Sequence, residues 1–526
     1  MEVEVILAIG MFAVAIVALL AGFPVAFTLG GVALIFAFIG ISLDVFDLRD
    51  LKNIAPRIEG VMNNNVLIAV PLFVIMGVIL ERSRIAEDLL GIASRLLGGV
   101  RGGLGYSVVL VGALLAASTG IVGATVITMT LIALASMLKQ GYDPRLATGT
   151  IAASGTLGQI IPPSIVLILL ADAISNASAQ AATSLGNVTS AISVQDLFSG
   201  ALIPGVLLVG FYLLWIAFNA YTKPERAPAM VFDEDLPPLT FKEIAFGLGA
   251  PLLLIFAVLG SILLGITPPT EAAAIGAAGA ALLAGIRLSE ETGSRLKPVL
   301  MAGLAGVVGL LVLNANFDLS VKQGAFSSTT KLAIGAAYMC ILALIAALAS
   351  GLLVLRKAGH LNSALSSAAH ITSMVFVILI GASLFSLVFT GGYRGDEMIE
   401  ALLTAMPGGV WGALVITMLV MFVLGFFLDF IEIIFIVVPL VAPPLIVLGV
   451  DPIWLAILMA LNLQTSFLTP PFGFALFYLR GVAPDGVETI DIWRGAIPFI
   501  GLQLAMILLV AAFPALATWL PSITAG

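Results

Sequence analysis

The sequence predicts an all-α polytopic membrane protein built from two inverted repeats, each with a re-entrant helical hairpin and a broken helix. Of its 526 residues, 61% are hydrophobic and only 10% are charged, whereas soluble globular proteins carry about 25% charged residues. Apolar runs of about 20 residues recur along the chain, the length a helix needs to cross the hydrocarbon core. A membrane β-barrel would instead show alternating segments of about ten residues.

Twelve continuous apolar runs are predicted to be membrane-spanning helices. They are residues 3–20, 25–39, 66–80, 146–170, 201–221, 245–264, 271–286, 299–313, 332–355, 371–389, 453–479 and 496–520. Two further stretches, 106–138 and 410–448, are too long for one crossing and have small or polar residues at their middle. We expect each to be a helical hairpin that enters and leaves the membrane on one side.

The distribution of Lys and Arg supports this arrangement. If both hairpins return to their own side, most basic residues fall on one face, which the positive-inside rule makes cytoplasmic. Residues 82–101 alternate charged with apolar residues and predict an amphipathic arm helix in the membrane plane. Residues 222–244 form the long hydrophilic linker, also cytoplasmic, which divides the chain into repeats at 1–221 and 245–526.

Two short motifs recur at a constant offset. Gly141-Tyr142-Asp143-Pro144 returns as Gly449-Val450-Asp451-Pro452, and Pro162-Pro163 returns as Pro470-Pro471. Both offsets are 308 residues (449 − 141 and 470 − 162). By the charge distribution the first hairpin opens to the cytoplasm and the second to the outside, so the repeats are inverted, which is typical of transporters. The second repeat is longer than the first, and its additional residues, about 288–362, are predicted to be a two-span insertion.

Each proline pair is expected to break its helix, 146–170 or 453–479, within the membrane, because prolines remove amide donors and clash with the preceding turn. The freed carbonyls cannot stay unpaired in lipid, where each costs several kcal/mol, so they line a cavity or bind a solute. Clustered oxygens suit a small hard cation such as Na⁺. The N-termini of half-helices favour an anion.

Several polar residues have two interpretations. Asp429 and Glu432 lie in an apolar stretch, where a carboxylate at mid-bilayer depth costs about 2.5 to 3.5 kcal/mol, and both are candidate functional groups. Asp429 could equally cap a helix, and Glu432 could be a protonated acid or a wall residue. Ser118 and Thr125 could serve ordinary helix packing.

These residues resemble the large membrane subunit of the tripartite ATP-independent periplasmic (TRAP) transporters. The matching stretches are residues 69–73 with Gly77, 152–164, 265–274, 425–429 and 464–473. The resemblance implies an elevator-type fold of the ion transporter superfamily in the bacterial inner membrane. It implies import of an organic acid anion by Na⁺ symport, with Na⁺ as the coupling ion and no other cofactor. The implied partners are a periplasmic substrate-binding protein and a small membrane subunit of about four helices.

The resemblance also implies where ions and substrate bind. The cation-binding residues would be Ser118, Thr119, Gly120, Ser154, Gly155 and Thr156 in one site, and Gly425, Asp429, Gln464, Thr465 and Ser466 in the other. The substrate is expected between them, beside Pro163, Ser164, Thr469, Pro470 and Glu432. Phe472 stands where the first repeat has Ser164, and this departure leaves open whether the substrate is a simple C4-dicarboxylate.

The residues alone do not exclude other function classes. An anion symporter or Na⁺/H⁺ exchanger of the same superfamily would need no binding protein. An intramembrane hydrolase would need a base at membrane depth, and the two modules contain Ser and Asp but no His or Lys. The chain has no Gly-x-x-x-x-Gly-Lys-[Ser/Thr] motif for ATP, so we expect no enzyme activity and an ion gradient as the energy source.

Overall fold

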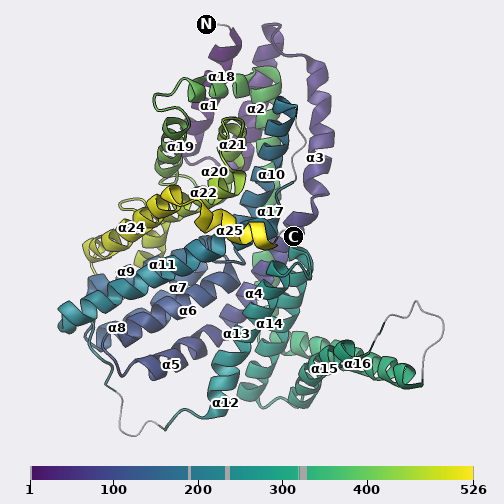
Figure 1. Cartoon of the computed structure of the whole chain (residues 1–526), viewed down its shortest axis with the longest axis vertical. Coiled ribbons are helices and arrows are strands. Elements are labelled where there is room, and N and C mark those ends of the chain that lie inside the picture. The colour runs from purple at the N-terminus through teal and green to yellow at the C-terminus, as the bar shows by residue number, and fades with distance from the viewer. Residues whose placement is uncertain (1–2, 187–190, 232–236, 318, 320–327, 525–526) are drawn as a thin grey trace.

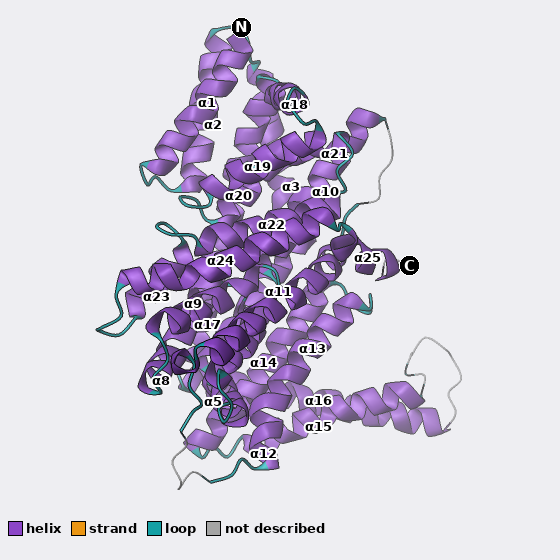
Figure 2. Ribbon diagram, turned by 60° about the vertical axis from the view of Figure 1, so that its left-hand side comes forward, coloured by secondary structure: helices purple, strands orange, loops and turns teal. Residues whose placement is uncertain are grey.

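The computed structural model describes residues 3–186, 191–231, 237–317, 319 and 328–524. Within these ranges the chain forms helices and no strand (Figure 2). The predicted all-α fold is confirmed. Among the described residues, 12 helices are long and apolar enough to cross a membrane.

The helices follow one another in two halves, joined by residues 223–240. The first half contains α1 (Val3–Leu20), α2 (Val25–Ser42), η1 (Leu48–Asn53), α3 (Ile54–Met62), η2 (Asn65–Ile68), α4 (Ala69–Arg82), α5 (Ile85–Leu97), α6 (Gly103–Thr119), α7 (Val122–Met129), η3 (Thr130–Leu134), α8 (Ala135–Lys139), α9 (Pro144–Thr156), η4 (Leu157–Gln159), α10 (Ile165–Leu185) and α11 (Val194–Thr222), with η5 (Pro224–Arg226) in the linker. The second half contains α12 (Phe241–Ile244), η6 (Ala245–Gly249), α13 (Ala250–Leu263), α14 (Pro269–Thr292), α15 (Lys297–Asn316), α16 (Ser328–Lys357), α17 (His360–Ser386), η7 (Leu387–Gly392), α18 (Gly395–Thr404), α19 (Val410–Leu424), α20 (Phe430–Ile436), α21 (Val438–Val447), α22 (Pro452–Leu468), α23 (Phe474–Val482), α24 (Thr489–Ala512) and α25 (Ala515–Thr524).

Both repeats contain a helix that stops ahead of its proline pair. α9 and η4 end before Pro162-Pro163 and α10 follows, while α22 ends before Pro470-Pro471 and α23 follows. Both pairs contain a cis peptide bond. Each first half-helix begins at an equivalent aspartate: Asp143 Oδ1 accepts from the Arg145 amide at 2.8 Å, and Asp451 Oδ1 accepts from the Trp454 amide at 2.8 Å. Such caps fix where the helices begin.

Two predicted boundaries are wrong. The first broken helix does not end at residue 170, because α10 continues to Leu185 through a polar segment that lies between the predicted spans 146–170 and 201–221. This segment is rich in alanine, the strongest helix former. The predicted span 496–520 is divided, since α24 ends at Ala512 and Pro514 lies between it and α25.

The two half-helices form the centre of the molecule. Every residue from Leu146 to Thr156 in α9, and from Trp454 to Leu468 in α22, is buried. Figure 1 shows α9 and α22 between the end that holds α1 and α2 and the end that holds α12. Large apolar side chains on other helices are exposed, among them Leu253 at 72% and Leu332 at 75%, as lipid-facing surfaces require.

The predicted insertion forms a helical hairpin, α15 with α16, which projects sideways near α12 in both views (Figures 1 and 2). Small residues line the contact between its helices: a Cβ at Gly309 would lie 2.9 Å from Cys340 Sγ, and a Cβ at Gly303 would meet Ala347. Close approach through small residues is typical of membrane helix pairs.

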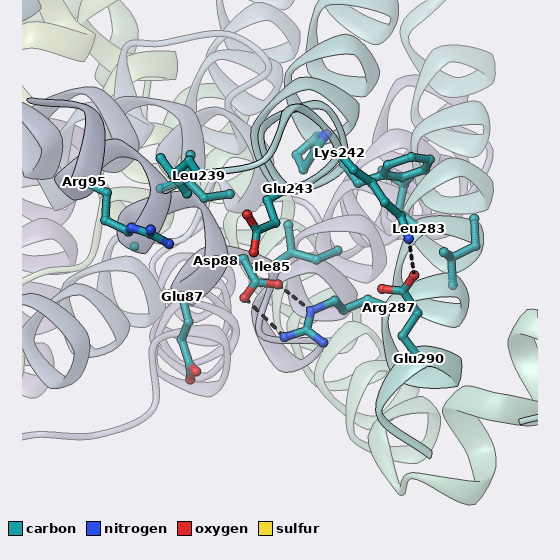
Figure 3. A pocket seen from close by; sticks show the side chains of 16 residues that line it. Ile85, Glu87, Asp88, Arg95, Leu239, Lys242, Glu243, Leu283, Arg287 and Glu290 are labelled. Atoms are coloured by element: carbon teal, nitrogen blue, oxygen red, sulfur yellow. Dashed lines mark hydrogen bonds and ion pairs between the residues drawn. The ribbon is translucent and has the colours of Figure 1, made fainter. Parts of the chain in front are cut away.

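The predicted arm is the shorter helix α5, which begins after Arg84 and ends at Leu97. Its apolar side is buried through residues such as Leu89, while Asp88 forms an ion pair with Arg287 of α14. Beside this pair Lys242 lies 4.0 Å from Glu290 (Figure 3). The arm is therefore fastened to α14 by charged groups at one edge of a cavity of about 480 Å³.

We predict that Gly495→Ala destabilises the protein. Gly495 lies in α24, where a Cβ would meet the backbone carbonyl oxygen of Arg145 and lie 3.0 Å from Thr148 Oγ1. Overpacking of this kind costs about 1 to 3 kcal/mol, so the thermal unfolding midpoint of the purified protein should fall by several degrees. Gly501→Ala in the same helix is the matched control, because a Cβ there meets nothing within 4 Å. Equal midpoints for the two variants would contradict the close α9–α24 packing.

Candidate functional site

Equivalent residues of the two repeats meet at the centre of the molecule. Gln464 Nε2 of α22 donates a hydrogen bond of 3.4 Å to Thr156 Oγ1 of α9. These residues are 308 positions apart, the same offset that separates the repeated motifs. In a two-fold arrangement a residue touches its own counterpart only close to the axis. If the two predicted repeats are related by a pseudo-two-fold axis, this contact lies at that axis.

In the first repeat the hairpin tip packs on the interrupted helix. The tip is Gly120-Ile121, which joins α6 to α7. A Cβ at Gly120 would lie 3.2 Å from the Ile165 amide nitrogen, and one at Gly158 would lie 3.2 Å from the Ala116 carbonyl oxygen. Glycine is required here for close backbone approach, and Gly120 also has a positive φ of 61°.

The predicted hydroxyls of this repeat donate to their own helix. Ser118 Oγ donates to the Leu115 carbonyl at 2.9 Å, Ser154 Oγ to Thr150 at 2.6 Å, and Thr156 Oγ1 to Ala153 at 2.8 Å. A hydroxyl that donates in this way keeps its lone pairs for a cation or another donor. Gly155 packs directly against Val126 of α7. The side chain of Thr119 lies outside the described residues.

The second repeat has the same construction. Gly425, at the end of α19, lies so close to α22 that a Cβ would be 2.7 Å from the Ser466 Cβ. Ser466 Oγ donates to the Leu463 carbonyl at 2.8 Å and Thr465 Oγ1 to Leu461 at 2.7 Å. Thr469 Oγ1 donates to the Thr465 carbonyl at 2.7 Å. Lone pairs of hydroxyls are again left available beside a hairpin tip.

The two carboxylates of the second hairpin are engaged in a capping box. Asp429 Oδ1 accepts from the Phe430 amide at 2.8 Å, and Glu432 Oε2 accepts from the Asp429 amide at 3.1 Å. Asp429 therefore caps α20, which is one of the two roles that its position in the sequence allowed. The Asp429 side chain also accepts from the backbone amide of Glu432, which completes the capping box.

A cavity of about 450 Å³ separates the two hairpin tips, and we call it the inter-tip cavity. Its wall includes Ile121 and Gly123 of the first tip, Asp429 and Phe430 of the second, and Arg82 of α4. Beside it, Thr128 Oγ1 of α7 donates to Glu81 Oε1 of α4 at 2.9 Å. The cavity therefore lies between both hairpins and α4, with charges of both signs in its wall.

The residues predicted to bind substrate lie elsewhere. Ser164 is fully buried, its hydroxyl donates to the Gln159 carbonyl at 3.0 Å, and neighbouring Pro163 is also buried. Thr469, Pro470 and Glu432 are half-buried and do not line the inter-tip cavity. Of the predicted site residues, the structure brings only Asp429 to this cavity.

A second cavity of about 440 Å³, the outer cavity, lies between α3, α10, α17 and the second hairpin. Asn64 Nδ2 donates to Asp172 Oδ1 at 2.7 Å in its wall, and Arg57 Nη1 reaches the Ser383 carbonyl at 3.5 Å. The wall also includes Phe435 of α20. α17 thus borders both cavities, through Ser367 in one and Ser383 in the other.

Sequence reasoning missed several residues at the centre and in the cavity. Tyr478 lines the inter-tip cavity, and Tyr212 and Gln503 reach the contact at Thr156. None of them has a counterpart in the repeat motifs. The available signal was a lone amide, Gln503, in the otherwise apolar run 496–520.

The chain is similar to known transport proteins over most of its length. The sequence model of one family, "Tripartite ATP-independent periplasmic transporter, DctM component", matches residues 12–321 and 310–516. A C4-dicarboxylate TRAP transporter large permease protein of Vibrio cholerae is 28% identical over 88% of this chain and 86% of its own length. One of the same description from Rhodobacter capsulatus is 26% identical over 98% of each chain. The sialic acid TRAP transporter large permease protein of Vibrio cholerae is 24% identical over 97% of each.

The fold is also similar to that of a solved transporter structure. The YdaH transporter of Alcanivorax borkumensis, described as having an unusual topology, superimposes with a TM-score of 0.56. The sequence identity is 15%, and the match covers 89% of this chain and 90% of that one. At this identity the likeness concerns the fold alone.

We predict that the two cavities open to opposite sides of the membrane. Ser367 and Ser383 lie on one helix, 16 residues (383 − 367) and about 24 Å apart. In a Cys340→Ser background, which removes the only cysteine, Ser367→Cys should react with a membrane-impermeant maleimide added from the cytoplasmic side. Ser383→Cys should react only from the outside. Labelling of both from one side would contradict the predicted orientation.

Proposed function

Because this chain belongs to the DctM family of tripartite ATP-independent periplasmic transporters, we propose that it imports an organic acid anion by Na⁺ symport. Membership makes it the large permease component of such a transporter and not an enzyme. It is a multi-pass protein of the inner membrane. Its proposed partners are a periplasmic substrate-binding protein and a small four-helix membrane subunit.

The observation that carries the proposal is the pair of interrupted helices, each packed against a hairpin tip. In both, serine and threonine hydroxyls donate backward to their own helix, as Ser154 and Ser466 do. Their lone pairs and the nearby carbonyls of the interrupted segment supply neutral oxygen ligands, which suit Na⁺. We assign one cation to the first set of predicted ligands and the other to the second: Ser118, Thr119, Gly120, Ser154, Gly155 and Thr156, and Gly425, Asp429, Gln464, Thr465 and Ser466.

The inter-tip cavity is the proposed substrate site. Its wall combines Arg82, which can pair with a carboxylate, with apolar and aromatic surface from Phe430, Phe467 and Tyr478. Phe467 lies 6.0 Å from Phe430 and 5.1 Å from Phe474 between ring centroids. One cation and several rings fit an organic acid with an apolar part better than a small dicarboxylate.

An elevator movement is proposed for the translocation step. The inter-tip cavity lies between the hairpin tips and α4, whereas the outer cavity lies between α10, the second hairpin and α3. α17 borders both. A body made of the hairpins and broken helices could slide against α4 and α17 and so close one cavity as it opens the other. Na⁺ would drive this movement through unequal affinity for the two states.

Asp429→Asn is expected to weaken Na⁺ activation of uptake in proteoliposomes by about tenfold or more, the effect of losing about 1.4 kcal/mol at one charged ligand. Asparagine still caps a helix, so the fold should persist. Asp451→Asn is the matched control, since Asp451 caps the start of α22 through the Trp454 amide and lies in neither hairpin tip. Unchanged Na⁺ activation in Asp429→Asn would remove this residue from the cation site.

Replacing Pro162-Pro163 by Ala-Ala is expected to abolish uptake while leaving membrane insertion intact. Alanine would let α9 continue toward α10 and cover the carbonyls of the interrupted segment. The control is Pro443-Pro444→Ala-Ala, a pair that lies inside the continuous helix α21. Full uptake by the Pro162-Pro163 variant would show that the interruption is not needed for transport.

A further inference from the structure

The cavity of about 480 Å³ beside the arm helix α5 lies apart from both cavities of the proposed transport pathway, and we call it the arm cavity. Helix α5 forms one wall, and α12, η6 and the last turns of α14 form most of the other (Figure 3). Phe241–Leu263 and Pro269–Glu290 are both long and apolar enough to cross a membrane. Because the arm cavity lies where the first of these spans begins and the second ends, it is at a membrane surface, the one predicted to be cytoplasmic.

The lining of the arm cavity changes from charged to apolar along both spans. In α14, Arg287 and Glu290 lie near the end of the helix, and Leu283 lies seven residues (290 − 283), or about 10 Å, further inside. In the other span Lys242 lies at the start and Pro251 nine residues (251 − 242), or about 14 Å, further inside. A charged rim above an apolar floor matches the change from lipid headgroups to acyl chains at a membrane surface.

The charged groups of the rim have both signs and are only partly paired with one another. Three basic and four acidic residues line the arm cavity: Arg95, Lys242, Arg287, Glu87, Asp88, Glu243 and Glu290. Asp88 is paired with Arg287, and Glu290 accepts a hydrogen bond from Lys297 at 2.7 Å. Lys242 approaches Glu290 only to 4.0 Å, and Glu87 has no hydrogen bond or ion pair to another described residue. Charges of both signs are therefore available to a ligand.

These charges fit a zwitterion better than an anion. Lipids that carry only negative charge are recognised by basic clusters, whereas here the acidic groups outnumber the basic ones. Arg95 donates through Nη2 to the Pro237 carbonyl and keeps its other N–H donors for a phosphate. Glu243 Oε2 accepts from the Thr240 amide at 2.7 Å, so its Oε1 and the Glu87 carboxylate can accept from an ammonium group. A primary ammonium donates three hydrogens, and a quaternary one donates none.

The arm leaves room for a ligand at Gly91, which lines the arm cavity. A Cβ at Gly91 would meet nothing within 4 Å, whereas a Cβ at Gly247 of η6 would meet the Ile92 side chain of the arm. The arm thus touches η6 closely at one point and leaves space beside it. The volume of about 480 Å³ lies within the range of about 300 to 1,000 Å³ that is typical of small-molecule sites.

We propose that the arm cavity binds the headgroup of a zwitterionic phospholipid with a primary amine. The phosphate would face Arg95, the ammonium group would face Glu87 and Glu243, and the acyl chains would pass over Phe246 and Leu283 into the bilayer. The lipid would join the arm to α12 and α14, in addition to the ion pair that already fastens the arm to α14. This site depends neither on the coupling ion nor on the transported substrate.

The test measures thermal unfolding of the delipidated full chain in detergent. Phosphatidylethanolamine, phosphatidylcholine and phosphatidylglycerol with identical acyl chains are each titrated into the protein. A ligand that binds only the folded state raises the unfolding midpoint, so phosphatidylethanolamine should raise it by several degrees, at a concentration about tenfold lower than the other two lipids need. Equal effects of the three lipids would overturn the assignment of the headgroup, and no effect of any would overturn the site. An equal effect of soluble glycerophosphoethanolamine would overturn the lipid as the occupant.

Two variants locate the effect. Gly91→Leu fills the arm cavity and should abolish the shift caused by phosphatidylethanolamine. Gly99→Leu is the matched control, because a Cβ at Gly99 also meets nothing within 4 Å and Gly99 does not line the arm cavity; it should respond as the wild type does. Glu87→Gln should reduce the effect of phosphatidylethanolamine to that of phosphatidylcholine. A full shift in Gly91→Leu would place the lipid elsewhere and overturn the site, and an unchanged preference in Glu87→Gln would overturn the ammonium contact.

Discussion

The need to satisfy buried backbone groups at the two proline pairs governs the rest of this structure. An interrupted helix leaves carbonyls and amides that neither lipid nor apolar side chains can pair. The protein surrounds them with its own polypeptide: in each repeat a hairpin tip covers the interruption, and glycines such as Gly120 and Gly425 let the backbones approach. Burial of α9 and α22 follows from this arrangement, and so does the internal position of the cation sites we propose.

The same constraint favours hydroxyls over carboxylates as buried polar groups in the centre of the protein. Serine and threonine can satisfy themselves within a helix and still offer lone pairs to a bound ion, so they can be fully buried at little cost. Asp429, which lines the inter-tip cavity, and Glu432, which does not, are both half-buried, and each accepts a backbone amide of α20 or its cap. A membrane-embedded charge needs such partners in every state of a transport cycle.

Two polar contacts between helices bear on the movement we propose. Asp88 of the arm pairs with Arg287 of α14, and Thr128 of the first hairpin bonds to Glu81 of α4. Both contacts join the first hairpin region to helices outside the broken-helix body. If the first hairpin region moves relative to these helices, both contacts must break or rearrange. Their strength therefore influences the equilibrium between the states of the transporter.

The proline pairs, the capping aspartates and their common offset determined much from sequence alone: two helices interrupted at known residues and two long apolar stretches that fold back. These features are local, since a proline acts on its own turn whatever surrounds it. Only the tertiary structure decided that Thr156 and Gln464 touch, that Gln503 and Tyr212 join them, and that Asp429 faces the inter-tip cavity while Ser164 does not. Contacts between helices depend on how whole surfaces pack, and a lone glutamine in an apolar run carries no sign of its neighbours.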